Sequence, residues 1–192
     1  MDIHHLLNYL GALFPLSPTF IITLENVMYE QEFSHKQKLL EPPQRAVHAW
    51  FLLEGVVSAS VFDKDGQEVV IRLYLPKVVF TDFNSFLYGR ASSVMLRAVG
   101  NVLVQHISIG DFKLRMTPFS QTNDLKEHII LRDQLLDQQR SMLIHLPDED
   151  RFNEFSAFFP MNDLPNVVGA SFLNMGTTKY CNLKAAWNSR NK

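Results

Sequence analysis

Residues 164–187, LPNVVGASFLNMGTTKYCNLKAAW, contain two short segments typical of helices on either side of a turn. Pro165 opens the first segment, and proline is favoured at the start of a helix. The turn NMGTT follows, and the second segment carries lysines and no acid. This pattern fits two alternatives, a helix-turn-helix that contacts DNA or a pair of helices that closes a small core.

Length and composition limit the class of protein. The 192 residues allow one large domain, or a medium domain and a small one. Apolar residues make up 46% and charged residues 20%, as in ordinary globular proteins. The net charge of −2 gives no general attraction to nucleic acid, so DNA binding would need a local basic patch.

The single cysteine, Cys181, excludes an internal disulfide and a cysteine-cluster metal site within one chain. The N-terminal segment lacks the basic region of a signal peptide, and no stretch approaches the length of a membrane span. A cytoplasmic protein with no membrane contact is therefore expected.

The first half of the chain is expected to be a helix followed by many strands. Apolar residues between positions 3 and 14 recur with helical spacing and stop at Pro15. Ser17 and Pro18 then provide the cap and first position of a second helix. From about 27 to 110, short apolar runs alternate with turns, which predicts an antiparallel β-sandwich or barrel.

Three features define these strands. WFLLEGVVSASVF predicts two strands around a turn or bulge at Glu54-Gly55, and DKDGQ predicts a hairpin turn at Gly66. VMLRAV and VLVQHISI predict two further strands separated by Gly100-Asn101. The segment FTDFNSFLYGRASS interrupts the strand pattern, and long excursions of this kind often carry function.

A long helix is predicted from Asn123, capped by Thr122 or Asn123 and ended by Pro147. One stripe recurs at spacings of four and three residues: Leu125, Ile129, Arg132, Leu136, Gln139 and Leu143. This spacing is typical of a two-stranded seam with a second copy of the chain. The alternative is a helix that lies on the β domain of its own chain.

No motif for catalysis or metal binding is present. The seven histidines form neither a close H-x-H pair nor an H-E-x-x-H helix. The G-x-S-x-G, P-loop and dinucleotide-binding motifs are also missing. We therefore expect neither an enzyme nor a metal site.

In this order, the elements resemble the CRP/FNR family of bacterial transcription regulators over nearly the whole chain. The resemblance is carried by PLSPTF, the hairpins AWFLLEGVVSASVF and DGQEVVIRLYLP, FTDFNSFL, SSVMLRAV and the C-terminal helix pair. It implies an α+β fold whose residues 1–122 form a double-stranded β-helix, or jelly-roll, of the cyclic-nucleotide-binding type. Residues 123–147 would form the dimerisation helix, and residues 148–192 a short helix-turn-helix domain without a following wing.

The cyclic-nucleotide cassette of this family departs from its usual form here. The family uses Gly-Glu for the ribose and Arg-Ser-Ala or Arg-Thr-Ala for the phosphate, and the matching positions are Thr81-Asp82 and Ser92-Ser93-Val94. Arg90 lies two residues before the position of the missing arginine. Because a buried phosphate without its charged partner binds poorly, no response to cAMP or cGMP is expected.

Two alternatives remain for this cassette. A non-standard small-molecule effector could bind there, with Thr81, Asp82, Arg90, Ser92 and Ser93 as its candidate contacts. The leading alternative is that no small molecule binds. No cofactor is expected, since a single cysteine excludes an iron–sulfur sensor and nothing in the sequence supports a haem sensor.

The same resemblance implies roles in the C-terminal pair. Asn174 takes the place of the turn glycine, because asparagine tolerates the left-handed conformation, and Thr177 caps the recognition helix. Gly169 falls in the middle of the first helix and should weaken it by about 1 kcal/mol. The residues expected to contact DNA are Thr177, Thr178, Lys179, Asn182, Lys184 and Arg190, whereas Tyr180, Leu183 and Trp187 pack inward.

The charge of this segment favours DNA binding, because phosphate contacts supply most of the affinity. From Gly176 to Lys192 there are four basic residues and no acid. The sequence thus predicts a dimeric transcription regulator of the CRP/FNR type, with double-stranded DNA, a second copy and RNA polymerase as candidate partners. The alternative is a small-molecule sensor or protein-interaction module with a vestigial DNA-binding head.

Overall fold

A computed structural model describes residues 2–190 as a mixed chain of helices and one antiparallel sheet. The strands are β1 (Tyr29–Phe33), β2 (Lys38–Leu40), β3 (His48–Phe62), β4 (Glu68–Tyr74), β5 (Val79–Phe80) and β6 (Met95–Ser108). The helices are α1 (His4–Leu13), α2 (Pro18–Glu25), α3 (Phe83–Tyr88), α4 (Ile109–Asp111), the π-helical turn η1 (Phe112–Met116), α5 (Gln121–Ile144), α6 (Asp148–Phe158), α7 (Asn166–Phe172) and α8 (Thr177–Arg190).

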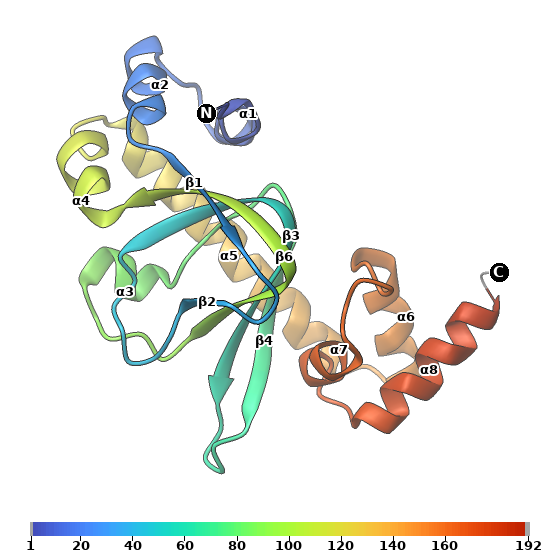
Figure 1. Cartoon of the computed structure of the whole chain (residues 1–192). Helices are drawn as coiled ribbons and strands as arrows, with labels where there is room; N and C mark the ends of the chain where they lie inside the picture. Colours follow the sequence, from blue (N-terminus) through green and yellow to red (C-terminus); the bar gives the residue numbers. More distant parts are fainter. Residues whose placement is uncertain (1, 191–192) are drawn as a thin grey trace.

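The chain has two parts joined by α5 (Figure 1). We call the first part, which comprises the strands with α1 to α4 and η1, the sheet domain. We call the second part, α6 to α8, the C-terminal helical unit, and it lies at the far end of α5 from α1 and α2. The predicted order of elements is therefore confirmed.

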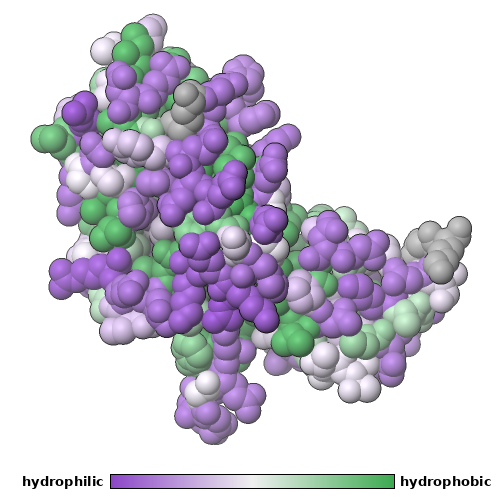
Figure 2. Space-filling view, viewed as in Figure 1, coloured by the Kyte–Doolittle hydropathy of each residue, from purple (hydrophilic) through white to green (hydrophobic). Residues whose placement is uncertain are grey.

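The sheet is antiparallel and has the strand order β1-β6-β3-β4, with β2 paired to β6 and β5 paired to β3. Its centre is the long pairing of β3 with β6, which runs from His48 opposite Ser108 to Ser60 opposite Met95. Four residues of β1 are exposed. Figure 2 shows that hydrophilic side chains predominate over this face and over the β3–β4 hairpin.

Two glycines bend the long strands without ending them. At Gly55 the backbone has φ +86°, and the register of β3 against β6 shifts on both sides of Glu54, so the predicted turn or bulge is a bulge. It lies within the single strand β3, so the prediction of two strands on either side of it was wrong. Gly100 has φ +84° within β6, which is a single strand, so the prediction of two separate strands there was wrong. A bulge glycine absorbs the bend while the flanking residues stay paired.

The hairpin between β3 and β4 has the predicted turn. Gly66 adopts φ +76°, and its N–H donates to the carbonyl of Asp63 at 3.1 Å. The carboxylate of Asp63 also accepts from the backbone N–H of Gln67 at 2.9 Å.

Alternation along β3 separates two apolar cores. Trp50 and Leu52 face the interior of the curled sheet, where Trp50 and Tyr74 both stack on Phe80. Phe51 points the other way, into the core covered by α1 and α2. Ser17 caps α2 as predicted, accepting from the N–H of Phe20 at 3.3 Å.

The long helix α5 has 24 residues and is about 36 Å long at 1.5 Å per residue. It begins at Gln121 after Ser120, so the predicted cap at Thr122 or Asn123 was wrong. The physical reason is that the chain enters the helix from α4 and η1 with its backbone already helical. The hydroxyl of Thr122 instead donates to the carbonyl of Met116 at 2.5 Å. Among residues 2–190, no helix is long and apolar enough to cross a membrane.

Candidate functional site

The helix pair α7 and α8 has the geometry expected from the opening stretch. The carbonyl of Pro165 accepts from the N–H of Gly169 at 3.1 Å, so Pro165 lies at the cap of α7. Asn174 adopts a left-handed φ of 51° in the turn, as predicted. Helix α8 begins at Thr177, and the carbonyl of Gly176 accepts from Tyr180 at 3.0 Å. Gly176 therefore occupies the cap position expected for Thr177.

The two helices approach closely at Gly169 and Tyr180. A Cβ at position 169 would overlap the phenol ring and hydroxyl of Tyr180, whose side chain is fully buried. The same hydroxyl contacts the sulfur of Met161 at 3.9 Å. Gly169, which the sequence presents only as a weak point of the helix, is thus the position that admits the Tyr180 ring. Ala170 beside it is also buried, at 2% exposure.

The exposed face of α8 carries most of the predicted DNA-contacting residues. Thr177, Thr178, Lys179, Asn182 and Arg190 are all exposed. Tyr180 is buried, and Leu183 and Trp187 pack against the same core, so the expected inward face is confirmed. In Figure 1, α8 forms an outer edge of the C-terminal helical unit. Lys192, the fourth base of the segment, lies outside the described residues.

Two of the basic residues already have partners within the chain. Lys184 is half-buried, and its ammonium donates to the carbonyl of Leu164 at 3.3 Å and to the amide oxygen of Asn166 at 3.2 Å. It therefore ties α8 to the start of α7. Lys179 lies 3.3 Å from the carboxylate of Asp148 in α6. This pair is exposed, so the partner can exchange for a phosphate at little cost.

The C-terminal helical unit is docked on the sheet domain. The backbone N–H of Val70 in β4 donates to the hydroxyl of Ser171 in α7 at 2.9 Å. A shared apolar core joins Val56, Val70, Leu73 and Val99 of the sheet to the aromatic residues of the unit.

Arg151 in α6 links the segments that follow α5 and α7. Its guanidinium donates to the carbonyls of Leu146 and Leu173, each at 2.8 Å. These carbonyls lie just beyond the last residues of α5 and α7. No local sequence pattern indicates this role, because Arg151 follows acids that indicate only the start of a helix.

The predicted stripe on α5 divides between two environments. Leu125 is buried in the core under α1 and α2, and Ile129 packs at its edge. The guanidinium of Arg132 lies over the ring of Tyr9, 5.3 Å from its centroid. Leu136, Gln139 and Leu143 line a cleft of about 520 Å³ between β4, α5 and α6.

The most exposed apolar residues of α5 lie on a neighbouring face, and one of them, Met142, also lines this cleft. Leu131, Leu135 and Met142 are 54%, 47% and 71% exposed. Their spacing of four and seven residues places them on one side of the helix. The predicted stripe therefore lies beside this exposed face. Its first residues, Leu125 and Ile129, pack against the chain's own sheet domain.

A buried ion-pair network, which no sequence motif predicted, anchors α5 to the sheet. One guanidinium nitrogen of Arg72 in β4 lies 2.8 Å from the carboxylate of Asp133, and the other two nitrogens pair with Asp137. The hydroxyl of Tyr74 donates to Asp133 at 3.1 Å. Burial raises the pKa of Asp133, although Arg72 and the Tyr74 hydrogen bond oppose the shift. The available signal was Arg72, a charged residue in the interior of the strand EVVIRLY, where its neighbours Ile71 and Leu73 are apolar.

Three of the five predicted ligand contacts in the cassette, Thr81, Asp82 and Ser92, already have hydrogen-bond partners within the chain. The hydroxyl of Thr81, which is buried, donates to the carbonyl of His48 at 2.9 Å. Asp82 caps α3 by accepting from Ser85, and it also accepts from the hydroxyl of Ser92 at 2.7 Å. Arg90 and Ser93 are exposed. The two halves of the cassette thus close on each other around a carboxylate, which would repel a phosphate.

Neither a known protein family nor a curated protein sequence matches this chain. Solved structures do share its fold. FixK2 from Bradyrhizobium japonicum has a TM-score of 0.72 at 11% identity, with 86% of each chain covered. The c-di-GMP-responsive global regulator CLP from Xanthomonas campestris has a TM-score of 0.65 at 14% identity, with 91% of this chain and 93% of that chain covered.

A third structure is a putative cyclic-nucleotide-binding protein from Ruegeria pomeroyi. Its TM-score is 0.63 at 15% identity, with 95% of this chain and 88% of that chain covered. The structural neighbours are thus CRP/FNR-family regulators and cyclic-nucleotide-binding proteins, not enzymes. At these identities, the likeness establishes the fold.

Proposed function

We propose that this protein is a DNA-binding transcription regulator of the CRP/FNR type, active as a homodimer and unresponsive to cAMP or cGMP. The observation that carries the proposal is the α7–α8 pair, which presents an exposed face with two threonines, Lys179, Asn182 and Arg190. The fold shared with FixK2 and CLP over most of each chain supports it.

Helix α8 has dimensions that suit the major groove of DNA. Its 14 residues extend about 21 Å at 1.5 Å per residue, and a major groove about 12 Å wide admits a helix. Thr178 and Asn182 are four residues apart and share the exposed face. Asparagine can pair with adenine through two hydrogen bonds, so Asn182 is the proposed base-reading residue. Lys179 and Arg190 would contact phosphates.

Dimer formation is proposed through the exposed face of α5. Leu131, Leu135 and Met142 would pack against the same residues of a second copy, because exposed apolar side chains on one helix face favour such a seam. The two α8 helices would then enter successive major grooves, about 34 Å apart along the DNA.

The proposed lack of response to cyclic nucleotides rests on Asp82. Its carboxylate holds α3 and the Ser92 loop together, so a cyclic phosphate would have to displace this contact and lie next to a negative charge. No side chain of the closed cassette offers a cation in its interior, since Arg90 is exposed. Regulation by these ligands would therefore need both a new charge and a rearranged loop.

The experiment that tests this function is selection of genomic DNA fragments by the purified full chain, at two salt concentrations and without added ligand. Enrichment of a palindromic site that weakens steeply with salt is the expected result. Enrichment unaffected by 1 mM cAMP supports the lack of response. A complete absence of enriched fragments, with the protein folded and dimeric, contradicts DNA binding.

A second candidate function has one specific observation in its favour. Lys184 is occupied inside the chain and Lys179 is paired with Asp148, which leaves little free positive charge on α8. A sensor or protein-interaction module with a vestigial DNA-binding head would have this feature. A blank DNA selection combined with small-molecule binding in the sheet domain would favour this second function.

A further inference from the structure

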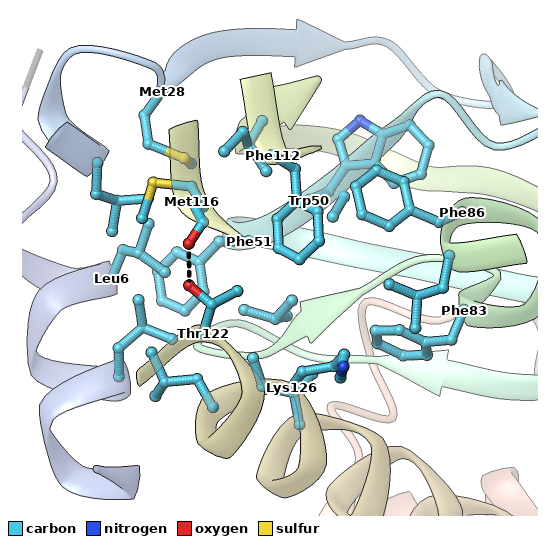
Figure 3. Close-up of a pocket in the computed structure, with 18 of the residues that line it drawn as sticks. Leu6, Met28, Trp50, Phe51, Phe83, Phe86, Phe112, Met116, Thr122 and Lys126 are labelled. Atoms are coloured by element: carbon cyan, nitrogen blue, oxygen red, sulfur yellow. Dashed lines mark hydrogen bonds between the residues drawn. The ribbon is translucent and has the colours of Figure 1, made fainter. Parts of the chain in front are cut away.

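An apolar cavity lies where the sheet domain meets the root of α5. Its volume is about 110 Å³, and it is lined by residues of α1, α2, β3, α3, η1 and the first turns of α5. Its wall includes Leu6, Met28, Trp50, Phe86, Phe112 and Met116 (Figure 3). An apolar cavity of about 150 Å³ in another protein stays dry and takes up benzene, so this one has the size for a small apolar group.

A second, more polar pocket adjoins the cavity. That pocket has a volume of about 200 Å³, and the two share Leu87, Phe112, Thr122 and Lys126 in their walls. Lys113, Thr117 and Asn123 line the polar pocket only. In Figure 3, Lys126 extends from α5 at the border of the apolar cavity, on the side of Phe83. The ammonium of Lys126 lies 3.0 Å from the amide oxygen of Asn123.

We call the apolar cavity and the polar pocket together the double cavity, and the charged residues that line it are all basic. Its walls contain two lysines, Lys113 and Lys126, and no acidic residue within the described part of the chain. The acid next to η1, Asp111, accepts from the hydroxyl of Ser108 at 2.8 Å and faces Arg115 at 3.7 Å. Among residues 2–190, neither lysine has a carboxylate within ion-pair distance.

We propose that this double cavity binds an amphiphilic anion, namely a short- or medium-chain fatty carboxylate such as hexanoate or octanoate. The hydrocarbon chain would fill the apolar cavity beside Trp50 and Met116. The carboxylate would lie in the polar pocket and accept charge-assisted hydrogen bonds from Lys126 and Lys113. A dry apolar end and a cationic mouth select a ligand with the opposite ends of an amphiphile, whereas a sugar or nucleotide would leave polar groups unpaired in the inner cavity.

The position of the site would let a bound ligand affect the start of α5. The wall contains both Met116, the last residue of η1, and Thr122, whose hydroxyl holds the carbonyl of Met116. Filling the cavity would fix η1 against the first turn of α5. Transmission of this effect to the helix pair α7–α8 rests on the function proposed above, whereas the binding itself does not.

The test uses Trp50, which lines the cavity, as a reporter. The full chain carries two tryptophans, so Trp187→Phe leaves Trp50 as the single emitter. Titration with 8-bromooctanoate, a heavy-atom quencher, should give saturable quenching that octanoate reverses and acetate does not. Calorimetric titration of the wild-type chain with octanoate provides the same measurement without Trp187→Phe, in case that variant folds poorly.

Variants at the mouth separate this site from general hydrophobic binding. Lys126→Met keeps the aliphatic stem and should weaken octanoate about tenfold or more, since hydrogen bonds to charged groups are the stronger ones. It should change the affinity for 1-octanol less than about threefold. Lys113→Met should act in the same direction, and Lys64→Met in the exposed β3–β4 turn should change neither. The proposal is overturned if quenching does not saturate, if octylammonium binds as well as octanoate, or if neither mouth variant weakens octanoate.

Discussion

The guanidinium of Arg72 lies 2.8 Å from the carboxylate of Asp133, and this contact joins β4 of the sheet to the middle of α5. Both side chains are largely buried, at 18% and 11% exposure, and Asp137 and Tyr74 complete the network. Any rotation of α5 relative to the sheet must break these contacts. The network therefore sets the position from which α5 carries the C-terminal helical unit.

Removal of Arg72 should destabilise the protein strongly. Arg72→Met leaves Asp133 buried without a counter-charge, which typically costs about 3–5 kcal/mol of unfolding free energy. Arg97→Met is the matched control, because Arg97 pairs with Glu68 at 2.8 Å on the same sheet but is more exposed. That variant should cost about 1 kcal/mol or less. Urea unfolding followed by circular dichroism measures both, and equal losses would argue against a structural role for the buried network.

A methyl group at position 169 should disturb the helix pair. Gly169→Ala would normally stabilise a helix by about 1 kcal/mol. Here the new Cβ would overlap the Tyr180 ring, so we expect a net loss of stability and less hydrogen-exchange protection in α7 and α8. Gly11→Ala in α1 is the control, since a Cβ there meets no neighbour. An increase in stability for both variants would show that Tyr180 moves aside freely.

Charge introduced on the exposed face of α5 should dissociate the proposed dimer. Leu135→Glu and Met142→Glu would place carboxylates within a seam between two copies, and like charges repel there. Ile22→Glu in α2 is the control, because Ile22 is 58% exposed but lies outside α5. Sedimentation equilibrium should show a dimer for wild type and the control, and a monomer for the two seam variants. A monomeric wild-type chain at micromolar concentration would contradict the proposed dimer.

The pair Lys179–Asp148 should tune DNA affinity. Asp148→Asn removes a negative charge that lies 3.3 Å from the Lys179 ammonium, so affinity for the selected DNA site should rise several-fold at low salt. Lys179→Ala should weaken binding and reduce the slope of log affinity against log salt by about 1 per chain. Fluorescence anisotropy at three salt concentrations measures both effects. Unchanged salt slopes would remove Lys179 from the DNA-contacting residues.

The stability of the sheet domain should fall on mild acidification because of two histidines. The rings of His48 and His106 lie 4.7 Å apart, and burial lowers the pKa of each, with His48 adding to the shift of His106. A lowered folded pKa means that the unfolded chain binds protons first, so unfolding free energy is lost as pH falls below about 6.5.

The variant His48→Phe keeps an aromatic ring next to Trp50 and should show a smaller loss of stability between pH 7 and pH 5 than wild type. Urea unfolding at a series of pH values checks this difference. Parallel curves for the two chains would show that His48 titrates alike in the folded and unfolded states.

Local features were largely predictable from the sequence. The cap at Ser17, the positive φ of Gly66 in the hairpin and the left-handed Asn174 each follow from the steric properties of one residue and its immediate neighbours. The inward face of α8 followed from the period of the helix. The fold class, an antiparallel sheet domain with a long helix and a C-terminal helical unit, followed from the order of these local patterns.

The remaining features depend on residues distant in sequence. Arg72 meets Asp133 across 61 positions, and Val70 meets Ser171 across 101, so no local pattern could reveal these pairs. Gly169 is a weak helix former in the sequence, but in the structure it is the only residue type that admits the Tyr180 ring.

Contacts between distant residues also explain why the predicted ligand cassette is closed and which face of α5 is exposed. From the sequence, Thr81, Asp82 and Ser92 are candidate ligand contacts. In the folded chain, the hydroxyl of Ser92 instead donates to the carboxylate of Asp82 at 2.7 Å. The period of α5 identified an apolar helix, but only packing against α1 and β4 decided which of its sides is exposed. The sequence by itself determined the local conformations and their order, because these depend on neighbouring residues. Tertiary structure alone decided which polar groups find partners and which faces stay open, because those outcomes depend on contacts between distant segments.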